Sequence, residues 1–74
     1  MPKRYSGKKV VEILTKKFGF VFVSQKGSHV KLRKTLPERN VTTVVPLHRE
    51  LAPGTLKSSL TLAEVDEKEF KESR

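Results

Sequence analysis

The chain has 74 residues, no cysteine and a formal net charge of +8. This length allows one domain with a small core, and the missing cysteines exclude a disulfide framework and a thiolate zinc site. No apolar run approaches the roughly 20 residues that a membrane-spanning helix needs. No apolar signal core follows the basic N-terminus, so we expect a cytoplasmic protein without a membrane partner.

The basic side chains are concentrated in the body of the chain. Residues 1–63 hold 13 basic and 3 acidic side chains, a net charge of +10, whereas residues 64–74 carry a net charge of −2. Such a basic body on a small surface favours a polyanionic partner, nucleic acid above all. The alternative interpretation is charge that serves solubility alone.

Apolar residues at helical spacing predict a first helix over about residues 6–17. Ser6 is a suitable N-cap, and Gly19 can adopt the left-handed conformation that ends a helix. Lys8 and Lys9 fall on the polar side, which is most simply a solvated face and secondarily a set of phosphate contacts. The apolar stripe consists of Val10, Ile13, Leu14 and Phe18.

A β-branched and aromatic run predicts a strand over Phe20–Val23. The turn expected after it covers Gln25–Ser28, with Gly27 at a positive φ. From His29 onward apolar and polar residues alternate, which predicts a second strand with one dry face and one basic face. The basic face would carry His29, Lys31 and Arg33, with Lys26 close by in the turn.

The remaining sequence predicts a third strand over 41–45 and two helices. Pro53 fits the first turn of one helix. Asp66 and Glu69 form a helix-start signal for a short final helix of about 66–72. The order α-β-β-β-α with antiparallel strands indicates an α+β two-layer sandwich, as in double-stranded-RNA-binding domains, with a short C-terminal helix.

Two histidines are the only side chains that titrate near neutral pH. His29, among cations, could move protons during phosphodiester cleavage while the cations offset charge on the phosphorane oxygens. From this context alone, a lone histidine in a basic strand is more often an ordinary surface residue. His48, at the exit of the third strand, could join His29, but it is more simply interpreted as a turn residue that hydrogen-bonds the link. The pair has no carboxylate pattern beside it, so neither a metal site nor another cofactor is expected.

Four motifs occur in a fixed order along the chain. They are Ser6-Gly7-Lys8, Phe18-Gly19-Phe20, Gln25-Lys26-Gly27-Ser28-His29, and Val45-Pro46-Leu47-His48 with Glu50-Leu51 and Pro53-Gly54-Thr55-Leu56-Lys57. Together they resemble the HicA family of RNA-cleaving toxins from bacterial and archaeal toxin–antitoxin pairs. The resemblance extends from about Ser6 to Phe70, so we expect one HicA-like domain over residues 1–74 with its core at about 6–70.

The resemblance implies a double-stranded-RNA-binding-like fold and a metal-independent endoribonuclease that cleaves messenger RNA. It implies that His29 is the catalytic acid or base, and that a cognate HicB antitoxin covers the active face. The free protein is expected to be a monomer. The residues expected to contact RNA are Lys8, Lys9, Lys26, Ser28, Lys31 and Arg33.

The chain departs from the family pattern at three positions. Many members have a second histidine where this chain has Val30, which we expect to be a packing residue. In the helix after Pro53, Ser59 and Glu64 stand where members often have an apolar residue and a glycine. Two other functions stay open: a non-catalytic RNA-binding module on the same fold, and a structural protein whose basic face meets an acidic partner.

Overall fold

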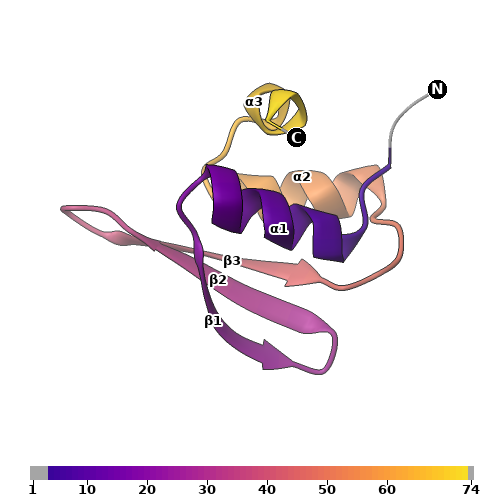
Figure 1. Cartoon of the computed structure of the whole chain (residues 1–74), viewed down its shortest axis with the longest axis horizontal. Helices are drawn as coiled ribbons and strands as arrows, with labels where there is room; N and C mark the ends of the chain where they lie inside the picture. The colour runs from indigo at the N-terminus through magenta and orange to yellow at the C-terminus, as the bar shows by residue number, and fades with distance from the viewer. Residues whose placement is uncertain (1–3, 74) are drawn as a thin grey trace.

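The structure, a computed structural model, describes residues 4–73. Its elements confirm the expected α-β-β-β-α order and the final short helix (Figure 1). The three strands form one antiparallel sheet in the order β1-β2-β3. The elements are α1 (Gly7–Lys17), β1 (Val21–Lys26), β2 (His29–Thr35), β3 (Asn40–Pro46), α2 (Pro53–Leu62) and α3 (Glu67–Glu72).

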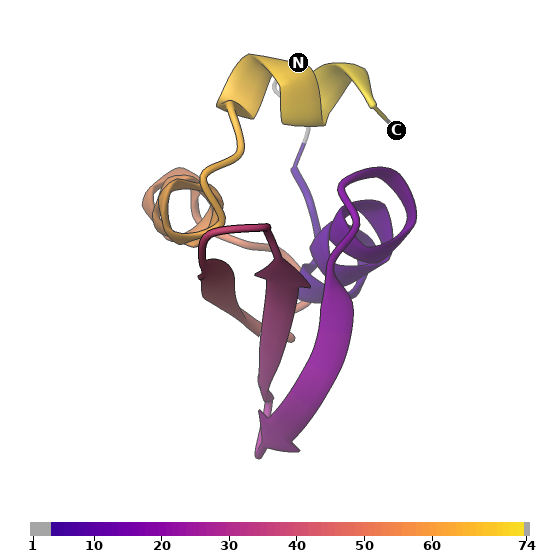
Figure 2. The ribbon, with the colours of Figure 1, turned by 90° about the vertical axis from the view of Figure 1, so that its left-hand side faces the viewer.

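The sheet and the helices form separate layers. Helices α1 and α2 lie side by side over one face of the sheet, and the opposite face is left open (Figure 2). The alternation expected for β2 is confirmed, because Val30 and Leu32 are buried while His29 and Lys31 are exposed. The core between the layers includes Val10, Ile13, Leu14, Val30, Leu32, Val41, Val45, Leu56 and Leu60.

Both ends of α1 follow the sequence expectation. The side chain of Ser6 accepts a hydrogen bond from the backbone N–H of Lys9 at 3.0 Å, which satisfies a free donor of the first turn. After the C-cap at Phe18, Gly19 has a φ of 78°, in the left-handed region. The backbone N–H of Phe20 then donates to the carbonyl of Leu14, so the chain turns directly into the sheet.

The first hairpin differs from the expectation in one respect. Gln25 and Lys26 belong to β1, and the turn consists of Gly27 and Ser28 alone. A two-residue turn with a positive φ matches the twist of the flanking strands, and Gly27 has a φ of 60°. Lys26 therefore pairs directly with His29 across the hairpin instead of lying in a loop.

Helix α2 is joined to β3 by a buried polar contact. Ser59 is buried although its side chain is polar. The hydroxyl of Thr43 donates to the carbonyl of Ser59 at 2.7 Å, and the hydroxyl of Ser59 donates to the carbonyl of Val44 at 2.9 Å. Both hydroxyls are thus satisfied, which removes most of the cost of burying them.

The chain reverses after α2 at Glu64, which has a φ of 57°. Glycine is the residue that adopts this left-handed conformation without strain. The Glu64 carboxylate forms an ion pair with Arg39 from the turn between β2 and β3. Asp66 then caps α3 by accepting from the backbone N–H of Glu69 at 3.1 Å.

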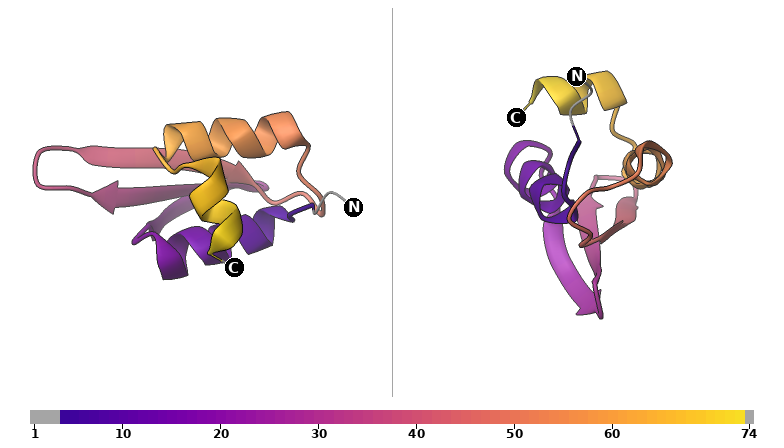
Figure 3. Two further views of the ribbon diagram at one scale, coloured as in Figure 1. Left: turned by 90° about the horizontal axis from the view of Figure 1, so that it is seen from above. Right: turned by 90° about the vertical axis from the view of Figure 1, so that its right-hand side faces the viewer.

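Helix α3 adds a third layer over the outer side of α1 and α2 (Figure 3). Its anchor is Phe70, whose side chain is completely buried. The Phe70 ring lies 5.2 Å from the ring of Tyr5 and 6.4 Å from that of Phe18, measured between centroids. The acidic end of the chain is therefore a packed helix that covers the helix layer and leaves the open face of the sheet uncovered.

Candidate functional site

The open face of the sheet carries the basic residues expected from the sequence. In β2, His29 and Lys31 are exposed and Arg33 is half-buried, on the side opposite the buried Val30 and Leu32. Across the hairpin, Lys26 of β1 pairs with His29. These four residues, Lys26, His29, Lys31 and Arg33, are called the basic face below.

Neighbouring strands supply small and hydroxyl side chains to the same surface. Ser24 pairs with Lys31, and Thr42 of β3 pairs with Arg33. The Arg33 Nε donates a long hydrogen bond of 3.5 Å to the Thr42 hydroxyl. This contact orients the guanidinium stem without neutralising its charge, so the charge stays available to an anion.

The turn that presents His29 is held from two sides. Within the hairpin, the side-chain amide of Gln25 donates to the carbonyl of Gly27 at 2.9 Å. From the end of β3, the backbone N–H of Leu47 donates to the carbonyl of Ser28 at 2.6 Å. Ser28 is thus fixed through its backbone, and its exposed side chain stands beside His29.

Three segments meet at this end of the molecule, where α1 begins, the first hairpin turns and β3 ends (Figure 1). The link after β3 is tied to α1, because the backbone N–H of Gly7 donates to the carbonyl of His48 at 2.9 Å. Lys8 follows Gly7 and is exposed. Lys8 therefore lies at the same end of the fold as His29.

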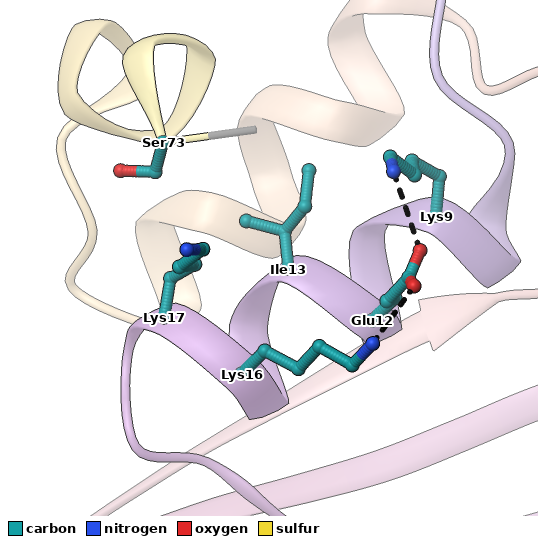
Figure 4. Close-up of a pocket in the computed structure, with 6 residues that line it drawn as sticks. All are labelled: Lys9, Glu12, Ile13, Lys16, Lys17 and Ser73. Carbon is teal, nitrogen blue, oxygen red and sulfur yellow. Dashed lines mark hydrogen bonds and ion pairs between the residues drawn. The ribbon is translucent and has the colours of Figure 1, made fainter.

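Lys9 lies in a different environment. Figure 4 shows it on the outer face of α1, where Glu12 sits between Lys9 and Lys16. The Glu12 carboxylate lies 3.3 Å from Lys9 and 3.2 Å from Lys16, and the hydrogen bonds from Lys16 and then Lys9 lower the pKa of Glu12. Lys9 thus shares a counter-ion within the chain, which weakens it as a phosphate contact relative to Lys8.

One surface feature was not expected from the sequence. The strand predicted over Phe20–Val23 is buried only at Phe20, whereas Val21 and Phe22 are 60% and 57% exposed. They lie on β1, which is an edge strand, and the pairing shifts between Phe22 and Ser24 as in a β-bulge. The run of apolar residues predicted a strand, but it did not predict which of these residues the helices would cover.

No group of three metal-ligating side chains comes together within residues 4–73. In the same residues, no helix is long and apolar enough to cross a membrane.

The layered α-β-β-β-α architecture with an open basic sheet face defines a domain of the double-stranded-RNA-binding-like class. Residues 7–65 match the family described as the HicA toxin of bacterial toxin–antitoxin systems. The match covers most of the chain, which therefore belongs to the HicA toxin family. A comparison with curated proteins gave no match. Helix α3, with Phe70, lies outside the matched residues.

Proposed function

We propose that this protein is a cytoplasmic ribonuclease toxin that cleaves messenger RNA without a metal. The observation that carries the proposal is the exposure of His29 at a fixed hairpin turn, on one face with Lys31 and Arg33. An imidazole there can take a proton from the attacking 2′-hydroxyl or give one to the leaving 5′-oxygen. The flanking cations can offset the charge that grows on the phosphorane oxygens.

The other expected RNA contacts surround this centre. Lys26 pairs with His29, and Ser28 precedes it in the turn. Lys8 extends the positive surface toward the start of α1, where a strand of RNA leaving the basic face would pass. Lys9 contributes long-range charge more than a direct contact, because Glu12 already binds it.

The test is cleavage of a synthetic RNA by purified protein in the presence of EDTA. We expect His29→Ala to lower the cleavage rate by about 10²- to 10⁴-fold, the range for a lost acid–base group, with RNA affinity retained. A single 2′-deoxy ribose at the cleavage site should block the reaction, because the nucleophile is then missing. Lys57→Ala, an exposed lysine on α2, is the matched control and should cleave normally.

An unchanged cleavage rate in His29→Ala would remove the histidine from the mechanism. Absence of products from the wild type would favour the second candidate, a non-catalytic RNA-binding module. That candidate is favoured by one observation: Val30 is buried where many family members have a second histidine.

Membership of a toxin–antitoxin family also supports a protein partner. We propose a HicB-type antitoxin that covers the basic face with acidic groups, and that extends over Val21 and Phe22 at the adjoining edge. Phe22→Ser should then weaken binding of the cognate antitoxin. Leu62→Ser is the matched control, because Leu62 is also 57% exposed but lies on α2. Equal affinities of the two variants would place the antitoxin elsewhere.

A further inference from the structure

His48 is the second histidine of the chain, and the proposed mechanism gives it no role. It lies in the link after β3, and its side chain is exposed. The link is anchored on both sides: Leu47 donates to the carbonyl of Ser28, and the carbonyl of His48 accepts from Gly7. The position of His48 is therefore fixed relative to the turn that presents His29.

The pairing of β2 with β3 brings the two histidines together. His29 pairs with Pro46, and the Leu47–Ser28 hydrogen bond continues this ladder by one residue. Paired Cα atoms are about 5 Å apart and a strand rises about 3.3 Å per residue, so the Cα atoms of His29 and His48 are at most about 12 Å apart. Two imidazoles at that separation can reach opposite sides of one phosphodiester.

The pairing register of β2 and β3 places His48 on the same side of the sheet as His29. Val45 is fully buried and Leu47 packs against the core, so both point toward the helices. Side chains two residues apart share a face in an extended segment. Pro46 pairs with His29 and so lies on the same side of the sheet as His29, although it is itself buried. His48, two residues further on and exposed, continues on that side.

Cleavage of RNA through its 2′-hydroxyl requires two proton transfers at different oxygens. The residue after His29 is Val30, a core residue that is 3% exposed and whose aliphatic side chain has no group that could supply the second transfer. The nearest carboxylate along the link, Glu50, is held by Arg4 at 3.1 Å. Among the described residues at this end of the fold, His48 carries the other imidazole.

We infer that His29 and His48 act as an acid–base pair, an inference that rests on the proposed ribonuclease function. One imidazole takes the proton of the 2′-hydroxyl as the 2′-oxygen bonds to phosphorus. The other gives a proton to the 5′-oxygen as the bond between phosphorus and that oxygen breaks. The products are a 2′,3′-cyclic phosphate and a free 5′-hydroxyl, with no net change in protons.

The test uses two RNA substrates that differ in one atom. The first is an ordinary oligoribonucleotide, and the second has a 5′-bridging sulfur at the cleavage site, a leaving group that needs no proton. His29→Gln and His48→Gln should each lose about 10²- to 10⁴-fold on the oxygen substrate. On the sulfur substrate, one of the two variants should regain most of the wild-type rate and the other should not.

Further controls separate proton transfer from charge and from folding. His48→Lys keeps a positive charge and should be as slow as His48→Gln on the oxygen substrate. Arg49→Gln tests the neighbouring charge and should retain most of the activity, and thermal unfolding should show each variant to be folded. Wild-type rates in His48→Gln or His48→Lys on the oxygen substrate would overturn the proposed acid–base pair. So would a result on the sulfur substrate in which both glutamine variants recover, or in which neither does. Failure of the wild type on both substrates would instead overturn the ribonuclease proposal.

Discussion

The backbone N–H of Gly7 donates a hydrogen bond to the carbonyl of His48 at 2.9 Å, which joins the start of α1 to the link after β3. The two segments are so close that a Cβ atom on Gly7 would lie 1.9 Å from the carbonyl oxygen of Pro46. This contact needs a residue without a side chain. It also fixes the position of His48 relative to the start of α1.

Gly7→Ala should therefore destabilise the protein by about 1–3 kcal/mol, because the added methyl group meets backbone that cannot move aside. Gly54→Ala is the control: it lies in α2 with no atom within 4 Å of its Cβ position, and it should gain up to about 1 kcal/mol. Chemical denaturation of both variants measures the difference. Equal unfolding midpoints would show that the close approach at Gly7 is relaxed in solution.

Glu64 combines a strained backbone with an ion pair to Arg39. The left-handed conformation costs a non-glycine residue roughly 1–2 kcal/mol. In an Arg39→Ala background, where the ion pair is already lost, Glu64→Gly should raise the free energy of unfolding by about 1 kcal/mol. Urea titrations of the single and double variants separate the two contributions. A loss of stability on adding the glycine would contradict the strain at this position.

Phe70 fastens α3 to the rest of the molecule. Phe70→Ala should cost about 3–5 kcal/mol, as expected for deletion of a fully buried aromatic ring. A chain of this size has only about 4–11 kcal/mol of total stability, so this variant should melt far below the wild type. Leu62→Ala, at a residue 57% exposed, should stay within about 0.5 kcal/mol of it. Similar melting temperatures for both variants would mean that α3 is not docked.

Lys31 should bind RNA through the phosphate backbone. Lys31→Ala should weaken binding to single-stranded RNA and reduce the slope of log affinity against log salt by about 0.7, the value for one lost phosphate contact. A 2′-O-methyl RNA avoids cleavage during the titration. Lys57→Ala should leave the slope unchanged. If both lysines changed the slope equally, RNA would be bound by overall charge and not by the basic face.

The sequence predicted those parts of the fold that depend on local periodicity. The cap at Ser6, the left-handed Gly19 and the alternation along β2 all appear where expected. The side chain of Asp66 also caps the last helix as its spacing indicated. Each of these features is decided by residues within one or two turns of each other, so a single sequence carries enough information.

Features set by pairing between strands were harder to predict. The turn was expected over Gln25–Ser28, but β2 pairs with Gln25 and Lys26 and draws them into β1. The exposure of Phe22 follows from the edge position of β1, which its own sequence does not encode. The left-handed Glu64 is imposed by the path from α2 to α3, since nothing in its side chain favours that conformation.

The basic face was predictable because His29, Lys31 and Arg33 share one strand. The placement of His48 was not, because it depends on hydrogen bonds from Leu47 and Gly7 to segments far away in the sequence. The sequence alone favoured a turn residue there. Candidate sites built from a single element can thus be read from the chain, whereas those assembled from several elements need the fold.

The hydrogen bonds between Thr43, Ser59 and Val44 have a consequence for how α2 can sit on the sheet. A purely apolar contact would let the helix slide by a turn at little cost, since one methyl group replaces another. Any such shift here would leave both hydroxyls and the Val44 carbonyl without these partners in a dry interior, although the Ser59 carbonyl would keep its hydrogen bond from the Ala63 N–H. The two hydrogen bonds therefore add little to total stability, but they fix a single position of α2 on the sheet.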